Sequence, residues 1–266
     1  FLLVLDAALA PDPEPLDGIG QRTGHVLAVN DPALAVALRK FLLQDVSVMS
    51  PALTIERDAV GHAFTSKVFD ALATDAEFVY AFTTEPVYTS LAGFYYGLAN
   101  DVSGIGRPIV SPAPESGSAG RLRGIISFKA ALEYPLNHET AHSWGVALEP
   151  TLGTGDGHWG TAGTYGVLGG FDPSTLVDHG DGTFTVGHFS AGGNDWLTTP
   201  FSTIELYLMG LVPPTDIDPI PVLSDITVLN NDASGVTISA TETTVTIDDI
   251  TTAHGARSPA FGDSPT

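Results

Sequence analysis

The chain has 266 residues, with 31 acidic against 10 basic side chains, a formal net charge of −21 and no cysteine. Without cysteine it has no disulfide, thiol nucleophile or Cys-ligated metal, and its acidity disfavours nucleic acid, which is bound through Lys and Arg. A hydrophobic content of 43% suffices for a folded core, and no apolar run approaches the ~20 residues that insertion across a membrane requires.

The charge is unevenly distributed along the chain. Residues 1–129 carry 9 basic and 14 acidic side chains, whereas residues 130–256 carry no Lys or Arg and 16 Asp or Glu. Acidic composition with 29 Gly and 19 Pro fits an exported bacterial protein, so we expect a secreted location. The apolar opening is either the end of a secretory signal or a first strand, and Asp6 favours the strand.

The first half alternates short strands with helical patterns. Strands are predicted at residues 25–29, 77–83 and 121–128, and helices at residues 33–43, behind an Asp31-Pro32 cap, and 63–73. Between them, residues 91–114 are rich in Gly, Ser and Pro and are predicted to be loops joining short strands. This alternation indicates an α/β layer.

The second half is richer in loops. A helix is predicted over residues 129–145, with Pro135 either kinking it or delaying its start. Glycine-rich loops follow, and then come a helix at 202–210, a Pro-rich linker at 212–222 and short strands within 226–247, with a turn at 231–235.

The informative segment is His138-Glu139-x-x-His142 in the predicted helix. Two His four positions apart on a helix project from one face, so both imidazoles can reach one Zn²⁺ while the Glu leans toward the metal-bound water. A catalytic zinc needs a third protein ligand. The main candidate is His158, because flanking glycines allow a close approach and Trp159 can anchor its loop; His179, His188 and Glu205 are alternatives.

The run His138-Glu139-x-x-His142-x-x-Gly145 resembles the metzincin clan of zinc metalloendopeptidases. The usual third-ligand position of that pattern is occupied by Leu148, which cannot bind metal, so the third His is displaced to His158. Leishmanolysin-like members of the clan also carry a long insertion there. The resemblance further implies a Met-turn beneath the ligands, for which Met209 is the candidate.

Two related zinc-peptidase patterns compete with this resemblance. Gluzincins take a Glu from a downstream helix, and Glu205 lies on such a segment. Aspzincins use an Asp within a Gly-Thr-x-Asp-x-x-Tyr-Gly element, which residues 160–166 echo without the Asp. The aspzincin pattern is therefore rejected.

The resemblance implies an α+β fold in which a twisted mixed sheet is followed by an active-site helix and a loop-rich C-terminal subdomain. We expect an N-terminal α/β subdomain at residues 1–145, ending in the zinc-binding helix, a C-terminal subdomain at 146–256 and a linker at 257–266. The strand at 121–127 is interpreted either as an edge strand that pairs with an extended substrate or as an ordinary interior strand.

The expected activity is hydrolysis of protein or peptide substrates, with His138, His142 and His158 holding one zinc ion and Glu139 as general base. Tyr207 and Tyr165 are candidate donors to the developing oxyanion. Calcium at Asp172, Asp178, Asp181 and Asp195 is a further hypothesis, beside the simpler one of solvated acidic turns. The alternative function is a catalytically silent module that binds protein or glycan. The sequence leaves the oligomeric state open.

Overall fold

The chain forms two compact units with mixed α+β structure. The first combines residues 1–101 with 110–135, and the second combines residues 102–109 with 136–266. The computed structural model describes residues 2–6, 26–29, 46–48, 76–83, 93–111, 120–128, 136–153, 157–187, 189–190, 199–232 and 235–263. Within these ranges no helix is long and apolar enough to cross a membrane.

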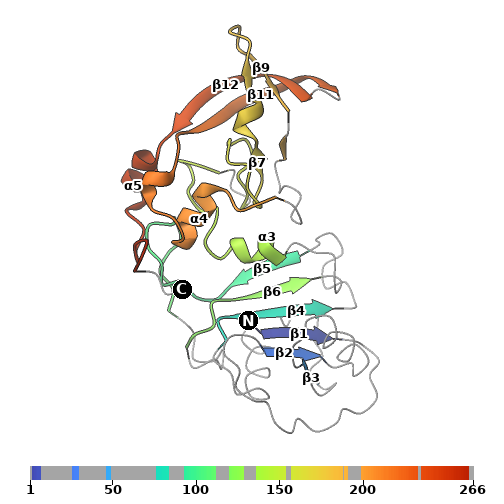
Figure 1. Ribbon diagram of the computed structural model, residues 1–266, viewed down its shortest axis with the longest axis vertical. Helices are drawn as coiled ribbons and strands as arrows, with labels where there is room; N and C mark the ends of the chain where they lie inside the picture. Colours follow the sequence, from blue (N-terminus) through green and yellow to red (C-terminus); the bar gives the residue numbers. More distant parts are fainter. Residues whose placement is uncertain are drawn as a thin grey trace. The chain divides into compact units, whose positions relative to one another are not determined.

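The first unit contains a six-stranded sheet (Figure 1). Its strands are β1 (Leu2–Asp6), β2 (Val26–Val29), β3 (Val46–Val48), β4 (Phe78–Thr83), β5 (Gly93–Gly97) and β6 (Gly124–Phe128). They lie in the order β3-β2-β1-β4-β6-β5, and all neighbours are parallel except β5, which pairs antiparallel with β6.

The composition of the central strands explains their position in the sheet. Phe78, Val79 and Tyr80 of β4 are all buried, as are Ile125 and Ile126 of β6. Consecutive buried residues mean that both faces of the strand are covered, which is typical of strands inside a parallel sheet.

One of the two interpretations of the strand at 121–127 is therefore wrong. The strand β6 bonds to β4 on one side and to β5 on the other, so it has no free edge on which an extended peptide could add. The sheet edge on this side is β5.

The other strand predictions for this unit are confirmed, since β2, β4 and β6 fall within the predicted ranges. The structure also forms β1 in the apolar opening segment, and it contains β3, which the sequence analysis did not predict. The helices predicted at residues 33–43 and 63–73 lie outside the described residues.

The second unit carries the described helices and two further sheets. The helices are α3 (Leu136–Ala141), α4 (Thr203–Met209) and α5 (Ile247–His254), with short 3₁₀ turns η2 (Pro173–Thr175) and η3 (Pro214–Asp216). Within the described residues, α3 starts at Leu136, the residue that follows Pro135. The helix α5 was not predicted, although Thr246 and Asp249 cap its first turn reciprocally.

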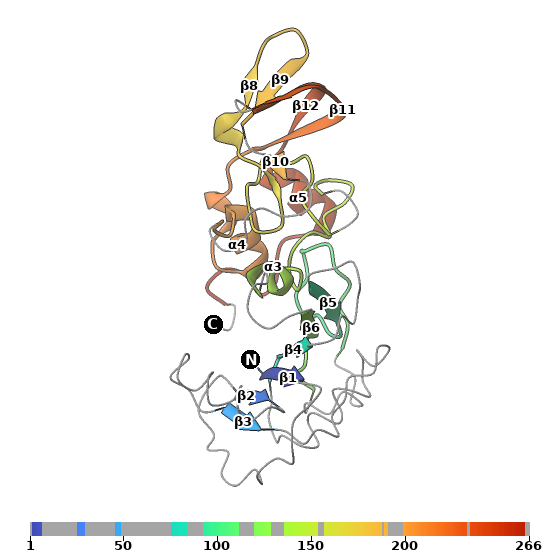
Figure 2. The same ribbon diagram turned by 90° about the vertical axis from the view of Figure 1, so that its right-hand side faces the viewer.

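The larger sheet of this unit has four antiparallel strands in the order β11-β12-β9-β8 (Figure 2). They are β8 (Val177–Asp178), β9 (Thr183–Val186), β11 (Ile220–Asp232) and β12 (Gly235–Val245). A two-stranded ribbon pairs β7 (Gly170–Phe171) with β10 (Phe189–Ser190). The predicted turn near residue 231 is confirmed, because Asp232 faces Gly235 at the end of the β11–β12 pair.

The core of the second unit joins the helices to the loops between them. Buried side chains from α3, α4 and α5 pack with Trp159, Val167 and Leu168 from the loop region. This shared core holds α3 and the loops of residues 157–169 in one body, which positions the residues of the next section.

The division of the structure differs from the expected boundaries in two respects. The helix α3 belongs to the second unit rather than ending the first. Residues 257–259, expected to begin a linker, pack on the second unit: Arg257 is buried and Ser258 exchanges two backbone hydrogen bonds with Ser103.

Candidate metal centre

Two histidines stand on one face of α3 because four positions correspond to about one helical turn. His138 lies within the helix and is buried, and His142 follows its last residue, donating its backbone N–H to the His138 carbonyl at 3.3 Å. Their ring centroids are 4.9 Å apart. His138 in α3 and His142 in the turn that follows it therefore present their imidazoles on one side.

His158 reaches this face from a loop. Its neighbour Gly157 has φ +85°, and a Cβ there would lie 3.4 Å from Cε1 of His142, so a glycine lets the backbone turn close to that ring. On the other side Trp159 is fully buried and donates its indole N–H to Glu205 at 2.9 Å. As expected, a glycine next to His158 allows the close approach of this loop and the buried Trp159 anchors it.

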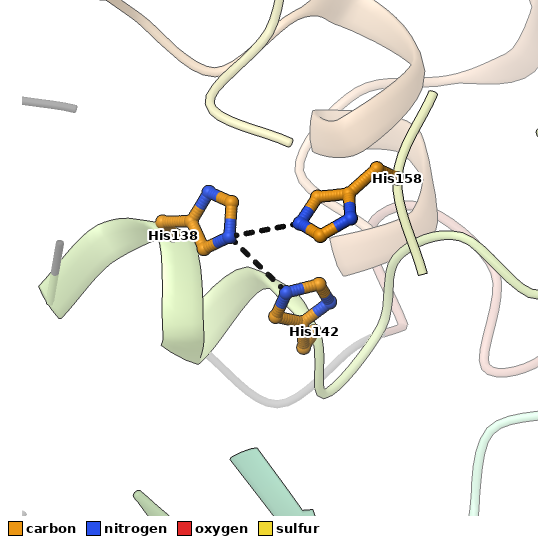
Figure 3. A group of neighbouring side chains, drawn as sticks. All are labelled: His138, His142 and His158. Atoms are coloured by element: carbon orange, nitrogen blue, oxygen red, sulfur yellow. Dashed lines mark hydrogen bonds between the residues drawn. The ribbon is translucent and has the colours of Figure 1, made fainter. Parts of the chain in front are cut away.

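The three imidazoles converge on one point (Figure 3). The Nε2 atoms of His142 and His158 each lie 3.2 Å from Nε2 of His138, and the three ligand atoms all lie within 4.8 Å of one another. Two nitrogens bound at about 2.0–2.1 Å in a tetrahedral site are separated by about 3.3–3.4 Å. The three histidines lie close enough to hold a metal ion.

A hydrogen bond at its second ring nitrogen fixes the orientation of His138. Its Nδ1 lies 2.7 Å from the carbonyl oxygen of Val167, which can only accept a hydrogen bond. Nδ1 therefore carries the proton, and the lone pair of Nε2 points to the centre. Ligating histidines commonly have such a partner on the other ring nitrogen.

The surroundings keep the rings on α3 neutral, which is the form that binds metal. Burial lowers the pKa of His138 to about 4, and the nearby His158 acts in the same direction, whereas the bond to Val167 opposes them. Burial also lowers the pKa of His142 to about 2, with additional contributions from His138, His158 and Arg107.

Glu139 is buried on the same helix, next to the first histidine. Loss of hydration on burial raises the pKa of its carboxyl to about 7. A carboxyl that gains and loses a proton near neutral pH has the acidity expected of a general acid and base.

Arg107 is a residue that the sequence analysis missed. Its guanidinium donates to the carbonyls of His142 and Gly145, at 2.5 and 3.3 Å, where the backbone leaves α3. A cation at this end satisfies carbonyls that have no partner in the helix and opposes the negative end of its dipole. No sequence signal indicated this contact, because Arg107 lies 35 and 38 positions before its partners.

The helix α3 ends at Ala141, four residues before the end predicted at residue 145, and turns follow it. The segment passes through turns to Gly145, where a Cβ would meet Cδ1 of Leu168 at 2.4 Å, and the left-handed residue is Val146 with φ 50°. Leu148, at the usual third-ligand position of the metzincin pattern, is fully buried in the core.

The alternatives to His158 lie elsewhere in the structure. Glu205 is 1% exposed and accepts four hydrogen bonds, from the backbone N–H groups of Val167, Leu168 and Ser202 and from Trp159. His179 is exposed, with its Nε2 2.9 Å from the hydroxyl of Thr185. His188 lies outside the residues that the structure describes.

The proposed accessory residues have mixed outcomes. Tyr207 is buried, and its hydroxyl accepts a hydrogen bond from the backbone N–H of Arg257 at 3.4 Å. Tyr165 is half-buried with φ 44° in the loop before Val167. Met209 ends α4 and packs against the core cluster. The role of Met209 as a Met-turn and those of Tyr207 and Tyr165 as oxyanion donors stay predictions.

Three of the aspartates proposed as calcium ligands lie in the described residues, and their carboxylates accept hydrogen bonds from residues two positions later in the chain. Asp172 accepts from Ser174, Asp178 from Gly180, and Asp181 from both the backbone and the hydroxyl of Thr183. These bonds favour the interpretation as acidic turns. Asp195 is not among the described residues.

Comparison of the chain with protein-family models, with curated proteins and with solved structures gives no match.

Proposed function

We propose that this chain is a zinc-dependent metalloendopeptidase of the metzincin type. One observation carries the proposal: three histidine Nε2 atoms converge while a buried glutamate stands beside the first of them on the same helix. A structural metal site would not need that carboxylate, whereas hydrolysis needs a general base.

The donor set favours zinc among the common metals. Three neutral imidazoles suit zinc, copper, iron and nickel, whereas calcium and magnesium prefer oxygen ligands. Three protein ligands with a fourth position open to solvent are the usual arrangement of catalytic zinc. When bound, Zn²⁺ would polarise the scissile carbonyl and increase the acidity of water.

The residues of the chain would bind the metal ion and transfer the proton. His138, His142 and His158 hold the ion, with His138 oriented by the Val167 carbonyl. Glu139 takes a proton from the attacking water and delivers it to the leaving amine, so water and a peptide yield a carboxylate and an amine. The buried position of Glu139 favours this proton transfer over exchange with bulk solvent.

The test is hydrolysis of a quenched peptide library by four samples of the full chain: wild type, wild type after chelation, Glu139→Gln and Glu149→Gln. Glu149 is an exposed glutamate of the same unit and serves as the matched control. We expect Glu139→Gln to keep its zinc and lose about 10²–10⁴-fold in kcat. Glu149→Gln should cleave like wild type, and readdition of zinc should restore the chelated sample.

Two results would reject the peptidase function. Cleavage that is unchanged by chelation and by Glu139→Gln would show that the activity does not come from this centre. Zinc binding without cleavage of any peptide in the library would favour the alternative, a module that binds protein or glycan.

A further inference from the structure

Glu205 is a buried carboxylate that the proposed hydrolysis does not use. Both oxygens are fully engaged: Oε1 accepts from Trp159 Nε1 at 2.9 Å and Leu168 N at 2.8 Å, and Oε2 accepts from Val167 N at 3.2 Å and Ser202 N at 2.7 Å. Four donors match the about four acceptor positions of a carboxylate. Burial raises the pKa of this carboxyl, whereas the hydrogen bonds from Leu168, Ser202 and Trp159 lower it. Because all four neighbouring groups are N–H donors, a proton on either oxygen would have no acceptor, so this arrangement fits the charged carboxylate.

Only one of these bonds is explained by local helix capping. Glu205 is the third residue of α4, and its bond to Ser202 N belongs to a capping box. The other three donors come from residues 159–168, which lie 37 to 46 positions earlier in the chain. The loop region is therefore organised around this carboxylate.

A single peptide group connects Glu205 to the metal centre. The N–H of Leu168 donates to Glu205, and the carbonyl of the same peptide, that of Val167, accepts from Nδ1 of His138. Because consecutive hydrogen bonds through one peptide polarise each other, the negative charge strengthens the carbonyl as an acceptor. This increases the electron density that His138 can offer through Nε2.

The same carboxylate also fixes the third histidine. Trp159, which donates to Glu205, directly follows His158, and the backbone N–H of Trp159 donates to the Leu168 carbonyl at 2.9 Å. The fit is close, since a Cβ on Gly166 would lie 2.3 Å from both carboxylate oxygens. Only glycine lets the loop approach Glu205 this closely.

We propose that Glu205 is the positioning residue of the metal centre: its charge, transmitted through the Val167–Leu168 peptide, sets the tautomer and ligand strength of His138 and anchors the loop of His158. This positioning role rests on one part of the proposed zinc function, namely that His138, His142 and His158 hold a metal ion. Glu205 itself is not a ligand.

The experiment uses Glu205→Gln in the full chain, because an amide keeps the size but replaces two acceptor positions with donors that oppose the N–H groups facing them. Leu208→Ala, on the same helix, is the control for general loss of stability, since Leu208 is fully buried. Trp159→Phe removes one of the four donors and is the milder variant.

Two quantities are measured, one of which needs no metal. The first is the tautomer of His138 in metal-free protein, from ¹⁵N chemical shifts at about pH 8, above the ordinary histidine pKa of about 6.5. The second is the affinity for Co²⁺ and Zn²⁺ by chelator competition, together with the visible spectrum of the Co²⁺ form.

We expect wild type and Leu208→Ala to hold the proton on Nδ1 and to share one Co²⁺ spectrum. In Glu205→Gln the proton of His138 should no longer be held preferentially on Nδ1, and the Co²⁺ spectrum should change. The affinity for metal should fall about 10–100-fold. Trp159→Phe should shift in the same direction by less.

An unchanged tautomer and affinity in folded Glu205→Gln would overturn the positioning role, and so would an equal loss in Leu208→Ala. If wild type binds no metal, the proposed function fails. The tautomer comparison then still decides whether Glu205 orients His138.

Discussion

His158 is the residue on which the metal centre depends most, because it comes from a loop whereas the other two histidines share a helix. Its Nε2 lies 3.2 Å from that of His138, as close as the helix partner His142. Without it, two imidazoles remain, one fewer than catalytic zinc sites employ.

His158→Ala should therefore abolish stoichiometric zinc binding while the chain stays folded. The matched control is His179→Ala, since His179 is exposed and bonds to Thr185 in the β8–β9 hairpin. Metal content measured after dialysis checks this. Full zinc occupancy in His158→Ala would remove this residue from the centre.

Residues of the centre could be predicted where their contacts are close in the sequence, and could not where their partners are distant. His138, Glu139 and His142 follow from helical spacing alone, and His158 was selected because glycines and Trp159 flank it. Glu205 was considered only as a ligand, because bonds to donors 37 to 46 positions away leave no pattern in the sequence. The contact of Tyr207 with Arg257 was not predictable for the same reason, since the two residues lie 50 positions apart.

At the level of elements, Arg107 determines how α3 ends. Arg107→Gln should lower the free energy of unfolding of the second unit by about 1.5–3 kcal/mol, the usual contribution of hydrogen bonds to a charged group. Urea unfolding in the presence of chelator measures this without a metal contribution. Arg121→Gln removes an exposed cation of the first unit, paired with Glu77, and as a control it should leave the unfolding of the second unit unchanged.

The cap of α5 predicts a pH dependence. Hydrogen bonds from the hydroxyl and N–H of Thr246 lower the pKa of Asp249 below its ordinary value of 3.8. A lowered pKa in the folded state means that this stabilisation is present above the ordinary pKa and lost as the pH falls through the folded-state value. The difference in melting temperature between wild type and Asp249→Asn should be positive at about pH 7 and vanish at about pH 2. A difference that persists at the lower pH would contradict this assignment.

The elements themselves were predictable where the apolar pattern is continuous, as in β2, β4 and β6. The sequence could not show whether β6 lies inside the sheet or at its edge. That depends on whether β5 pairs with it, and β5 is a Gly-flanked strand in a segment expected to consist mainly of loops. The helix α5 was missed because six of its eight residues are Ile, Asp or Thr, which are weaker helix formers than Ala, and Ala253 is the single strong one.

Over the whole molecule, the second unit combines strong acidity with very few cations. Its sequence contains two, Arg107 and Arg257, and both donate to backbone carbonyls: Arg107 near the end of α3, Arg257 to Leu208 and Met209 of α4. The stretch 130–256, with 16 acidic residues and no Lys or Arg, contains all three histidines.

This charge distribution predicts electrostatic steering of cationic substrates, provided that the chain is a peptidase. Raising ionic strength from about 0.01 M to about 0.15 M shortens the Debye length from about 30 to about 8 Å, so kcat/KM for Lys- and Arg-rich peptides should fall. Neutral peptides of equal length are the control and should respond little. Identical responses of both peptide sets would refute steering.

The coordination of zinc in the full chain, measured by X-ray absorption at the zinc edge, tests the proposed metal centre itself. The proposed centre predicts one zinc per chain with three imidazole nitrogens at about 2.0–2.1 Å and one further light ligand from solvent. A zinc ion with fewer than three imidazoles, or a six-coordinate shell of oxygens, would contradict it.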